Sequence, residues 1–210
     1  IGSLPLGSQA NRQGRVIGSN LGGIDSTFPG FVGTWCVKLF KLSFAGVGLT
    51  PPKAIAAGFD AAGVCIEQLN RAHFYPEKEM MSLEIVVDKS NRRVLGLQGC
   101  CKDADAIKAR VDAVAGVLEY AKPTIDDISN LEVAYAPPFA AAMDAINTVA
   151  NVADNVLSGR FNAITGDQFM ELWRNRANNN VYFIDMRPPK ASKKIESKYP
   201  EWHAIPLEEL

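Results

Sequence analysis

Apolar residues recur at strand-like spacing on both sides of one polar turn, and this pattern constrains the fold of the chain more than any other feature of the sequence. Leu83, Ile85 and Val87 recur at every second position, and residues 94–97 continue the pattern beyond the polar segment 88–93. A period of two places successive side chains on opposite faces of a strand, so the pattern predicts an antiparallel β-hairpin with 88–93 as its turn. One face of such a hairpin is apolar and needs a second layer to cover it.

Two helices with apolar stripes are candidates for that layer. One is predicted over 103–120, where Asp103 can cap the first turn, and the other over 144–157, where Gly159 ends it. Their stripes, at the three- and four-residue spacing of a helix face, are Ile107, Val111, Val114 and Leu118, and Ile146, Val149, Ala153 and Val156. The sequence therefore predicts an α+β fold, an antiparallel sheet with packed helices.

The remaining elements are shorter. They comprise a helix at 8–22 capped by Ser8, a strand-forming run over 34–49, a short helix capped by Thr50 that ends at Gly58, strands over 61–68 and 131–135, a helix over 164–173, and a strand over 181–185. The run 181–185 is apolar on both faces, which is typical of a parallel sheet. Since the character of the chain changes near residue 160, we expect a second, α/β domain to begin there.

Charge and composition exclude several classes of protein. Lys plus Arg number 22 and Asp plus Glu number 23, so the net charge is −1 and no broad basic footprint for nucleic acid exists. No apolar run approaches the ~20 residues that span a bilayer. We therefore expect neither nucleic acid nor membrane as a partner. Both ends of the chain are interpreted as cuts, which predicts a piece of a longer polypeptide.

The four cysteines favour a reduced, cytoplasmic protein. Cys36 and Cys65 stand in apolar, strand-like runs and are predicted to be buried packing residues. Cys100 and Cys101 are adjacent, which fits neither a zinc site nor a thioredoxin-type motif. For this pair the sequence leaves two alternatives, a strained vicinal disulfide or two free thiols.

The sequence offers few candidate catalytic residues. His73 and His203 lie far apart, and no acid–base pair, Gly-rich phosphate loop or metal cluster stands out. Tyr135 precedes Pro137 and Pro138, and it is either a packed aromatic with a hydrated hydroxyl or a reactive phenol. The helix start at 8–11 either binds an anion or is an ordinary surface cap. Asp185, after a strand, either orients a ligand loop or caps a turn.

Two strings of residues carry a resemblance to a known family. They are Ala10-Asn11-Arg12-Gln13-Gly14-Arg15, with Gly33-Thr34 leading into a strand, and Tyr135-Ala136-Pro137-Pro138-Phe139, with Asp144 and Asn147 soon after. This order resembles the flavin-dependent pyridine nucleotide–disulfide oxidoreductases, in the branch of coenzyme A-disulfide reductases, NADH-dependent persulfide reductases and NADH oxidases. Residues 163–210 resemble the opening of a rhodanese-like domain.

The resemblance implies a division of the chain and a role for each part. Residues 1–23 would end a flavin-binding domain, 24–158 would form the dimerisation domain, and 163–210 would be a partial rhodanese-like domain. The parent would be an FAD enzyme that forms a homodimer and reduces a small-molecule disulfide, persulfide or polysulfide with NAD(P)H, often with coenzyme A as thiol carrier. The FAD would carry the difficult redox step.

Particular residues take roles only through this resemblance. Ala10, Asn11 and Gln13 would lie at the pyrimidine end of the flavin, where the helix dipole stabilises negative charge. Tyr135 would reach across the dimer and donate a proton to a leaving thiolate. Phe139 stands where a second aromatic hydroxyl is common in the family, so that hydroxyl is missing here.

This chain also departs from the family pattern. It has neither Gly-rich dinucleotide motif, none of its four cysteines matches the flavin-proximal cysteine, and the rhodanese-like segment stops before its persulfide cysteine. We therefore expect the chain by itself to bind no cofactor tightly and to be inactive. Two alternatives stay open, an NADH oxidase or peroxidase of the same family and a stand-alone dimerisation module.

Overall fold

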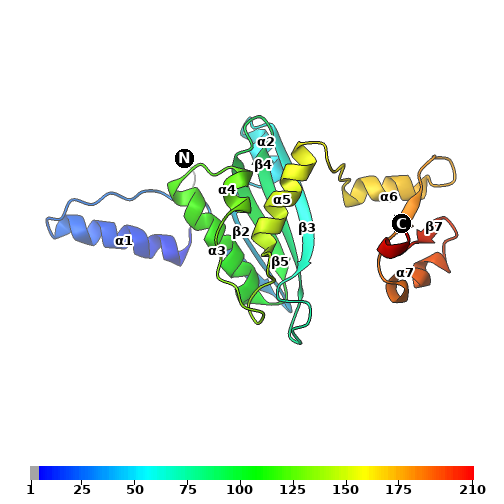
Figure 1. Cartoon of the computed structure of the whole chain (residues 1–210). Helices are drawn as coiled ribbons and strands as arrows, with labels where there is room; N and C mark the ends of the chain where they lie inside the picture. Colours follow the sequence, from blue (N-terminus) through cyan, green and yellow to red (C-terminus); the bar gives the residue numbers. More distant parts are fainter. Residues whose placement is uncertain (1–4) are drawn as a thin grey trace. The chain divides into compact units, whose positions relative to one another are not determined.

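The computed structural model describes residues 5–210 and divides into two compact units, the first ending at Phe161 and the second spanning Asn162–Leu210. The first contains α1 (Gly7–Leu21), β1 (Trp35–Leu39), β2 (Leu42–Gly48), α2 (Pro51–Ala56), β3 (Ala61–Leu69), β4 (Met80–Asp88), β5 (Val94–Cys101), α3 (Ala104–Tyr120), α4 (Ile125–Ser129) and α5 (Ala145–Leu157) (Figure 1). The second contains α6 (Gly166–Arg174), β6 (Phe183–Asp185), α7 (Pro189–Glu196), β7 (Trp202–Ala204) and a 3₁₀ turn at Leu207–Glu209.

An antiparallel sheet of order β1-β2-β5-β4-β3 forms the first unit, and the predicted hairpin β4–β5 lies at its centre. The hairpin turn is closed by Asp88, whose carboxylate accepts hydrogen bonds from the backbone and hydroxyl of Ser90 and from Asn91. These bonds, those from Ser90 above all, lower the pKa of Asp88. The α+β prediction for this part of the chain is confirmed.

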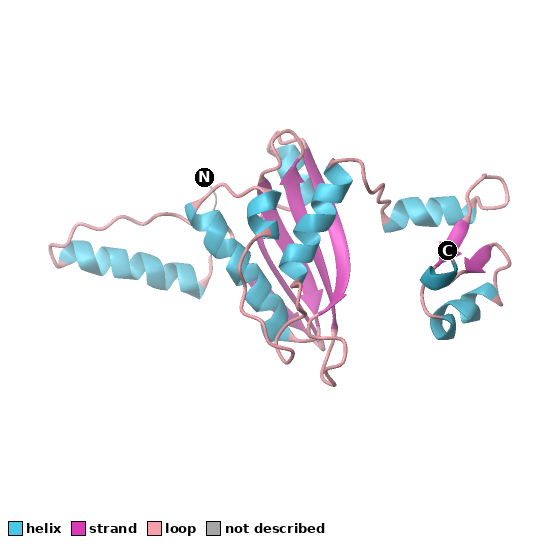
Figure 2. Cartoon of the chain, viewed as in Figure 1, coloured by secondary structure: helices cyan, strands magenta, loops and turns pink. Residues whose placement is uncertain are grey.

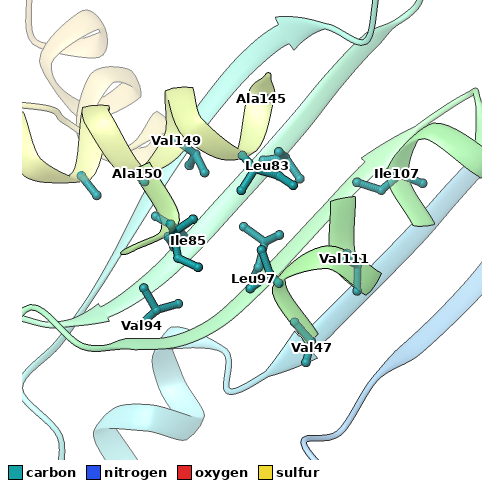
Figure 3. Packing of buried hydrophobic residues seen from close by; sticks show 14 of the residues in the cluster. Val47, Leu83, Ile85, Val94, Leu97, Ile107, Val111, Ala145, Val149 and Ala150 are labelled. Atoms are coloured by element: carbon teal, nitrogen blue, oxygen red, sulfur yellow. The ribbon is translucent and has the colours of Figure 1, made fainter. Parts of the chain in front are cut away.

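Helices α3 and α5 cover one face of the sheet (Figure 2). Val47, Leu97 and Ile85 are neighbours across β2, β5 and β4, and each is fully buried. Figure 3 shows sheet residues facing the two helices, with Ala145, Val149 and Ala150 on α5 and Ile107 and Val111 on α3. Burying one such aliphatic side chain stabilises the fold by roughly 1.5–3 kcal/mol, so this layer dominates the unit's stability.

The prediction that Cys36 and Cys65 are buried is wrong, since both are exposed. They lie on β1 and β3, the two edge strands of the sheet. Cys65 falls between Val64 and Ile66, which face the core, so its own side chain points to the opposite face. Cys101 is buried, Cys100 is half-buried, and both are free thiols rather than a vicinal disulfide.

Two further sequence predictions, for 131–135 and for Ser8, are wrong, and the prediction that Thr50 caps α2 is confirmed in position only. Residues 131–135 form no strand, because the side chain of Asn147 binds the backbone carbonyls that precede and begin this segment. Ser8 lies inside α1, whose N-cap position is Leu6 with no side-chain cap. Thr50 occupies the N-cap of α2 without a side-chain hydrogen bond. The short helix α4, with a capping box of Thr124 and Asp127, was not predicted.

The second unit pairs β6 and β7 in parallel, with Phe183 opposite Trp202. Its interior is a cluster of five aromatic rings, whose paired centroids lie 5.0–6.4 Å apart; the members are Phe169, Trp173, Phe183, Tyr199 and Trp202. The prediction that the 181–185 strand is buried on both faces is wrong. Phe183 and Asp185 are buried whereas Ile184 is exposed, because the aromatic cluster covers only one side of β6.

Candidate functional site

Tyr135 lies on the irregular segment between α4 and α5 and keeps half of its surface exposed (51%). It lines a hollow of about 360 Å³ whose other walls come from the segment after β3 and from the residues that follow Tyr135 itself. These lining residues are Gln68, Leu69, Arg71, Ala72, His73, Phe74, Ala141 and Ala142. The phenol of Tyr135 is therefore at an open surface with mainly apolar surroundings.

The segment that carries Tyr135 is tied down on both sides of that residue. Before it, Asn147 Nδ2 donates to the carbonyl of Leu131 at 2.9 Å. After it, the backbone N–H of Ala72 donates to the carbonyl of Pro137 at 3.4 Å, and Gln68 Nε2 donates to that of Met143 at 2.8 Å. The segment has no regular hydrogen-bond ladder, so these two side-chain bonds and one backbone bond supply the order that secondary structure supplies elsewhere.

A buried ion pair stands beneath this segment. Arg110 on α3 and Asp144 at the N-cap of α5 join through Nη2 and Oδ2 at 2.7 Å, and their side chains are 8% and 5% exposed. The sequence contains a signal for this pair. Arg110 falls on the apolar stripe of α3 between Ile107 and Val111, and a charged residue there requires a buried partner.

The predicted flavin-contacting residues Ala10, Asn11 and Gln13 are all exposed on α1. Asn11 Nδ2 donates to the carbonyl of Gly7 at 2.9 Å. The first turn of α1 contains no acidic residue and no side-chain cap, so its dipole is left without an anionic partner from this turn.

Tyr135 and α1 do not share a site within one chain. Asn11 lines a different hollow, of about 440 Å³, together with Arg12, Phe28 and Pro29. Within residues 5–210 no group of three or more His, Cys, Asp and Glu side chains could hold a metal ion. The same residues include no helix with the length and apolarity that crossing a bilayer requires.

Asp185, the other polar candidate, forms its hydrogen bonds with nearby residues of the second unit. Its carboxylate accepts from Arg187 Nε at 2.9 Å and Nη2 at 2.7 Å, and from Trp202 Nε1 at 3.0 Å. The hydrogen bonds from Arg187 hold the pKa of Asp185 far below its ordinary value. Of the two interpretations left open by the sequence, the structure agrees with a turn cap.

Comparison with known proteins decides the family. Residues 35–146, more than half of the chain, match the pyridine nucleotide-disulphide oxidoreductase dimerisation domain. The chain belongs to this family. The matched range runs from β1 to the first turn of α5, so it includes the whole sheet, α3, α4 and the Tyr135 segment. Helix α1 and the second unit lie outside it.

Curated relatives with this dimerisation domain act on sulfur compounds. The chain is 36% identical over 149 residues to the NAD(P)H sulfur oxidoreductase (CoA-dependent) of Pyrococcus abyssi, covering 71% of this chain and 32% of that protein. It is 32% identical over 148 residues to the coenzyme A disulfide reductase of Staphylococcus aureus, covering 70% and 33%. The chain therefore spans about a third of the length of the curated relatives it matches.

Solved structures of the family extend the likeness over both units. The NAD-dependent persulfide reductase from A. fulgidus aligns with a TM-score of 0.84 and 34% identity over 99% of this chain and 36% of that one. The reduced CoADR-RHD of Bacillus anthracis aligns with a TM-score of 0.81 and 27% identity over 100% and 36%. A water-forming NADH oxidase from Lactobacillus brevis, at 24% identity and a TM-score of 0.69, shares the fold.

Proposed function

We propose that this chain is part of a longer FAD-dependent NAD(P)H reductase of disulfides or persulfides, in the branch that uses coenzyme A. Its own work is to form the homodimer and to present Tyr135 to the active site of the partner subunit. Residues 1–23 would close the flavin-binding domain, 24–158 would pair the subunits, and 163–210 would begin a rhodanese-like domain. We place this enzyme in the cytoplasm, with neither nucleic acid nor membrane as partner.

The observation that carries this proposal is the presentation of Tyr135. Its ring is half-exposed on a segment tied down on both sides, and it lies in a hollow separate from the one beside Asn11. If Tyr135 acted at the flavin of its own subunit, its phenol would have to lie near α1 of the same chain. A phenol held open at a surface, in a family defined by dimerisation, is placed to act on a second copy.

Helix α1 supplies a test of whether these residues fit a flavin. Its first turn has no side-chain cap and no acidic residue, and Ala10, Asn11 and Gln13 are exposed along it. An uncompensated helix dipole favours negative charge at this end, so these residues fit one edge of the ring system. When bound, FAD supplies hydride acceptance and electron transfer to sulfur. NAD(P)H and coenzyme A are proposed for the whole enzyme, and no residue of this chain is assigned to either.

Tyr135 would act as a proton donor. A phenol is neutral at physiological pH and can donate its proton to a thiolate that leaves when a sulfur–sulfur bond is reduced. The apolar walls of the hollow, such as Phe74 and Ala141, would limit the water that competes for this proton. The Pro137–Pro138 pair stiffens the backbone just after the tyrosine, which keeps the ring in one place.

The test is turnover of the full-length protein with Tyr135→Phe. Loss of a general acid lowers kcat by roughly 10²- to 10⁴-fold, while nucleotide affinity stays near that of the unmodified protein. Tyr182→Phe is the matched control, because Tyr182 is also exposed (65%) but lies in the second unit. Equal losses in turnover and in nucleotide affinity, or no change in either, would remove Tyr135 from the mechanism.

A mixing experiment tests action across the dimer. One subunit carries Tyr135→Phe, and the other keeps Tyr135 but lacks the flavin-proximal cysteine, so neither homodimer turns over. If Tyr135 serves its partner, a random mixture recovers about a quarter of the sites, because one site of each heterodimer is complete. If Tyr135 serves its own subunit, no activity returns.

The chain studied by itself gives a simpler check. We expect the 210-residue chain to be dimeric by light scattering and colourless in the flavin absorption band. Disulfide, persulfide, oxygen and peroxide are then compared as electron acceptors of the full-length protein. Faster turnover of oxygen or peroxide than of sulfur substrates would favour the oxidase or peroxidase alternative.

A further inference from the structure

The buried pair of Arg110 and Asp144 is unusual within the described part of this chain. Of the ion pairs among residues 5–210, it is the one in which both side chains are less than a tenth exposed. The contact is bidentate, since Arg110 Nε also reaches Asp144 Oδ1 at 3.3 Å. Burial of two charges contributes little net stability compared with apolar packing, so stability alone is a weak reason for this pair.

The remaining hydrogen bonds of Arg110 connect separate parts of the first unit. The guanidinium donates to the carbonyls of Ala106, Asn70 and Phe139, each at 3.2 Å. Ala106 belongs to α3, Asn70 directly follows β3, and Phe139 lies four residues after Tyr135. Asp144 in turn accepts from the backbone N–H of Ile146 at 3.0 Å and so fixes the start of α5.

Two of these carbonyls belong to the two segments that form the Tyr135 hollow. One wall is made by lining residues between 68 and 74, among them Leu69 and Arg71, the two chain neighbours of Asn70. The other is made by Tyr135 and residues 141–142, with Phe139 between them. The two N–H groups of Arg110 Nη2 are shared among Asp144 Oδ2 at 2.7 Å and the carbonyls of Asn70 and Phe139, so this nitrogen links the two segments.

Asn70 is held in turn by other groups. Its Nδ2 donates to Asp103 Oδ2 at 3.0 Å, and its Oδ1 accepts from the backbone N–H of Glu79 at 2.8 Å. Asp103 caps α3 and also pairs with Arg71 at 2.9 Å. These bonds tie Asn70 and Arg71 to the start of α3 and to the residue before β4, and Arg110 links Asn70 in turn to the irregular segment that carries Tyr135.

From this connectivity we infer that Arg110, oriented by Asp144, is a positioning residue that holds Tyr135 at the place where it meets the partner subunit's active site. The inference rests on the proposed function of Tyr135. Arg110 contacts no reacting atom in this role and acts only through the backbone of the Tyr135 segment. Lysine cannot replace it, because an ammonium group lacks the planar fork that binds a carboxylate and two carbonyls together.

The first experiment measures turnover of the full-length protein with Arg110→Lys. Displacement of the Tyr135 segment lowers kcat about 10- to 100-fold, whereas KM for NAD(P)H and the dimeric state are unchanged. Arg92→Lys is the control, because Arg92 is likewise held by aspartate carboxylates, those of Asp126 and Asp154, and its ion pairs involve no residue of the Tyr135 segment. We expect wild-type kcat from this control. Equal losses of kcat in the two variants would overturn the inference.

A double variant separates positioning from general damage. If Arg110 acts through Tyr135, then Arg110→Lys has little further effect on kcat once Tyr135→Phe is present. A full additional loss in that background would show that Arg110 works by another route. Asp144→Asn is the second variant to use if Arg110→Lys does not fold, because asparagine keeps the cap of α5 while weakening the pair. The same kcat-selective loss is expected from it.

Hydrogen exchange on the 210-residue chain distinguishes failure of this inference from failure of the proposed function. Arg110→Lys should speed exchange of the amides at 139–142, whereas Arg92→Lys should not. If exchange becomes faster but Tyr135→Phe leaves turnover unchanged, the positioning effect stands and the proposed function is rejected. Unchanged exchange at 139–142 would reject the positioning effect whatever the turnover.

Discussion

The two units of this chain bury their apolar side chains in different ways. In the first, aliphatic residues from β2, β4 and β5 meet α3 and α5 in one continuous layer, with Ile85, Leu97 and Val149 fully buried (Figure 3). In the described part of the second unit, Phe183 is the one apolar side chain that is less than a tenth exposed. The rest of its interior consists of partly exposed aromatic rings, of which Phe169 and Trp173 are stacked and the other pairs contact edge to face.

Local signals do not explain this difference. Each unit contains a complete capping box, formed by Thr124 and Asp127 in α4 and by Thr165 and Gln168 in α6. Helices α4 and α6 are therefore specified equally well at their starts. What differs is the amount of apolar surface removed from water, and this sets the free energy of unfolding. The comparison predicts that the two units unfold separately and that the second unfolds first.

The largest effect is expected from Trp173→Ala. Trp173 contacts four other rings of the cluster and the guanidinium of Arg176, whose Cζ lies 4.6 Å from its ring centroid. Truncating a buried aromatic costs about 3–5 kcal/mol, and for Trp173, which is partly exposed but contacts four rings, we expect a loss of that order and unfolding of the second unit. Fluorescence of Trp202 in a Trp35→Phe background reports that unit, and far-UV circular dichroism reports the helices of both. A single transition shared by both signals would contradict independent units.

A comparable or slightly smaller loss is expected from Leu97→Ala in the first unit. Leu97 is fully buried between Val47 and Ile85, so its truncation costs about 2–5 kcal/mol. Urea denaturation followed by circular dichroism measures it, while Trp202 fluorescence should keep its own midpoint. Leu39→Ala, at an exposed position of β1 (52%), is the control and should change little.

The two capping boxes allow a smaller, matched comparison. Thr124→Ala and Thr165→Ala each remove a side-chain acceptor from a helix start, at a cost of about 1 kcal/mol. We expect the former to lower only the midpoint of the first unit and the latter only that of the second. Amide exchange at Asp127 and Gln168, whose N–H groups bond the threonine hydroxyls, measures the loss locally. If Thr165→Ala lowered the unfolding midpoint of the first unit, the two units would not unfold independently.

The smallest effect is expected from mild acid on Asp185. Hydrogen bonds from Arg187 lower the pKa of this carboxyl below its ordinary value of 3.8. A lowered pKa in the folded state stabilises the fold above the ordinary value, and that contribution is lost as the pH falls through the folded pKa. Between pH 7 and pH 4 only the start of this loss occurs. Urea denaturation of the second unit at both pH values should show a small decrease that Asp185→Asn abolishes.

Much of the first unit could be predicted because its signals are local. The period of two in 83–97 and the stripe of α3 depend only on neighbouring residues, and Asp103 and Asp144 cap their helices through bonds within three positions. The residues around Tyr135 left its role open, and the catalytic role came only from resemblance to a family. Its half-exposed ring and its hollow could not be predicted, because both depend on where the segment after β3 lies.

The sequence by itself determined the long helices α3 and α5, the central hairpin, and the point near residue 160 where the chain changes character. Tertiary structure alone decided that Cys36 and Cys65 are exposed, that 131–135 is no strand, and that Arg110 meets Asp144 across 34 residues of sequence. The physical reason is the distance along the chain over which each interaction acts. Backbone periodicity and capping act within one turn or strand, whereas burial and ion pairing depend on which distant segments the sheet brings together.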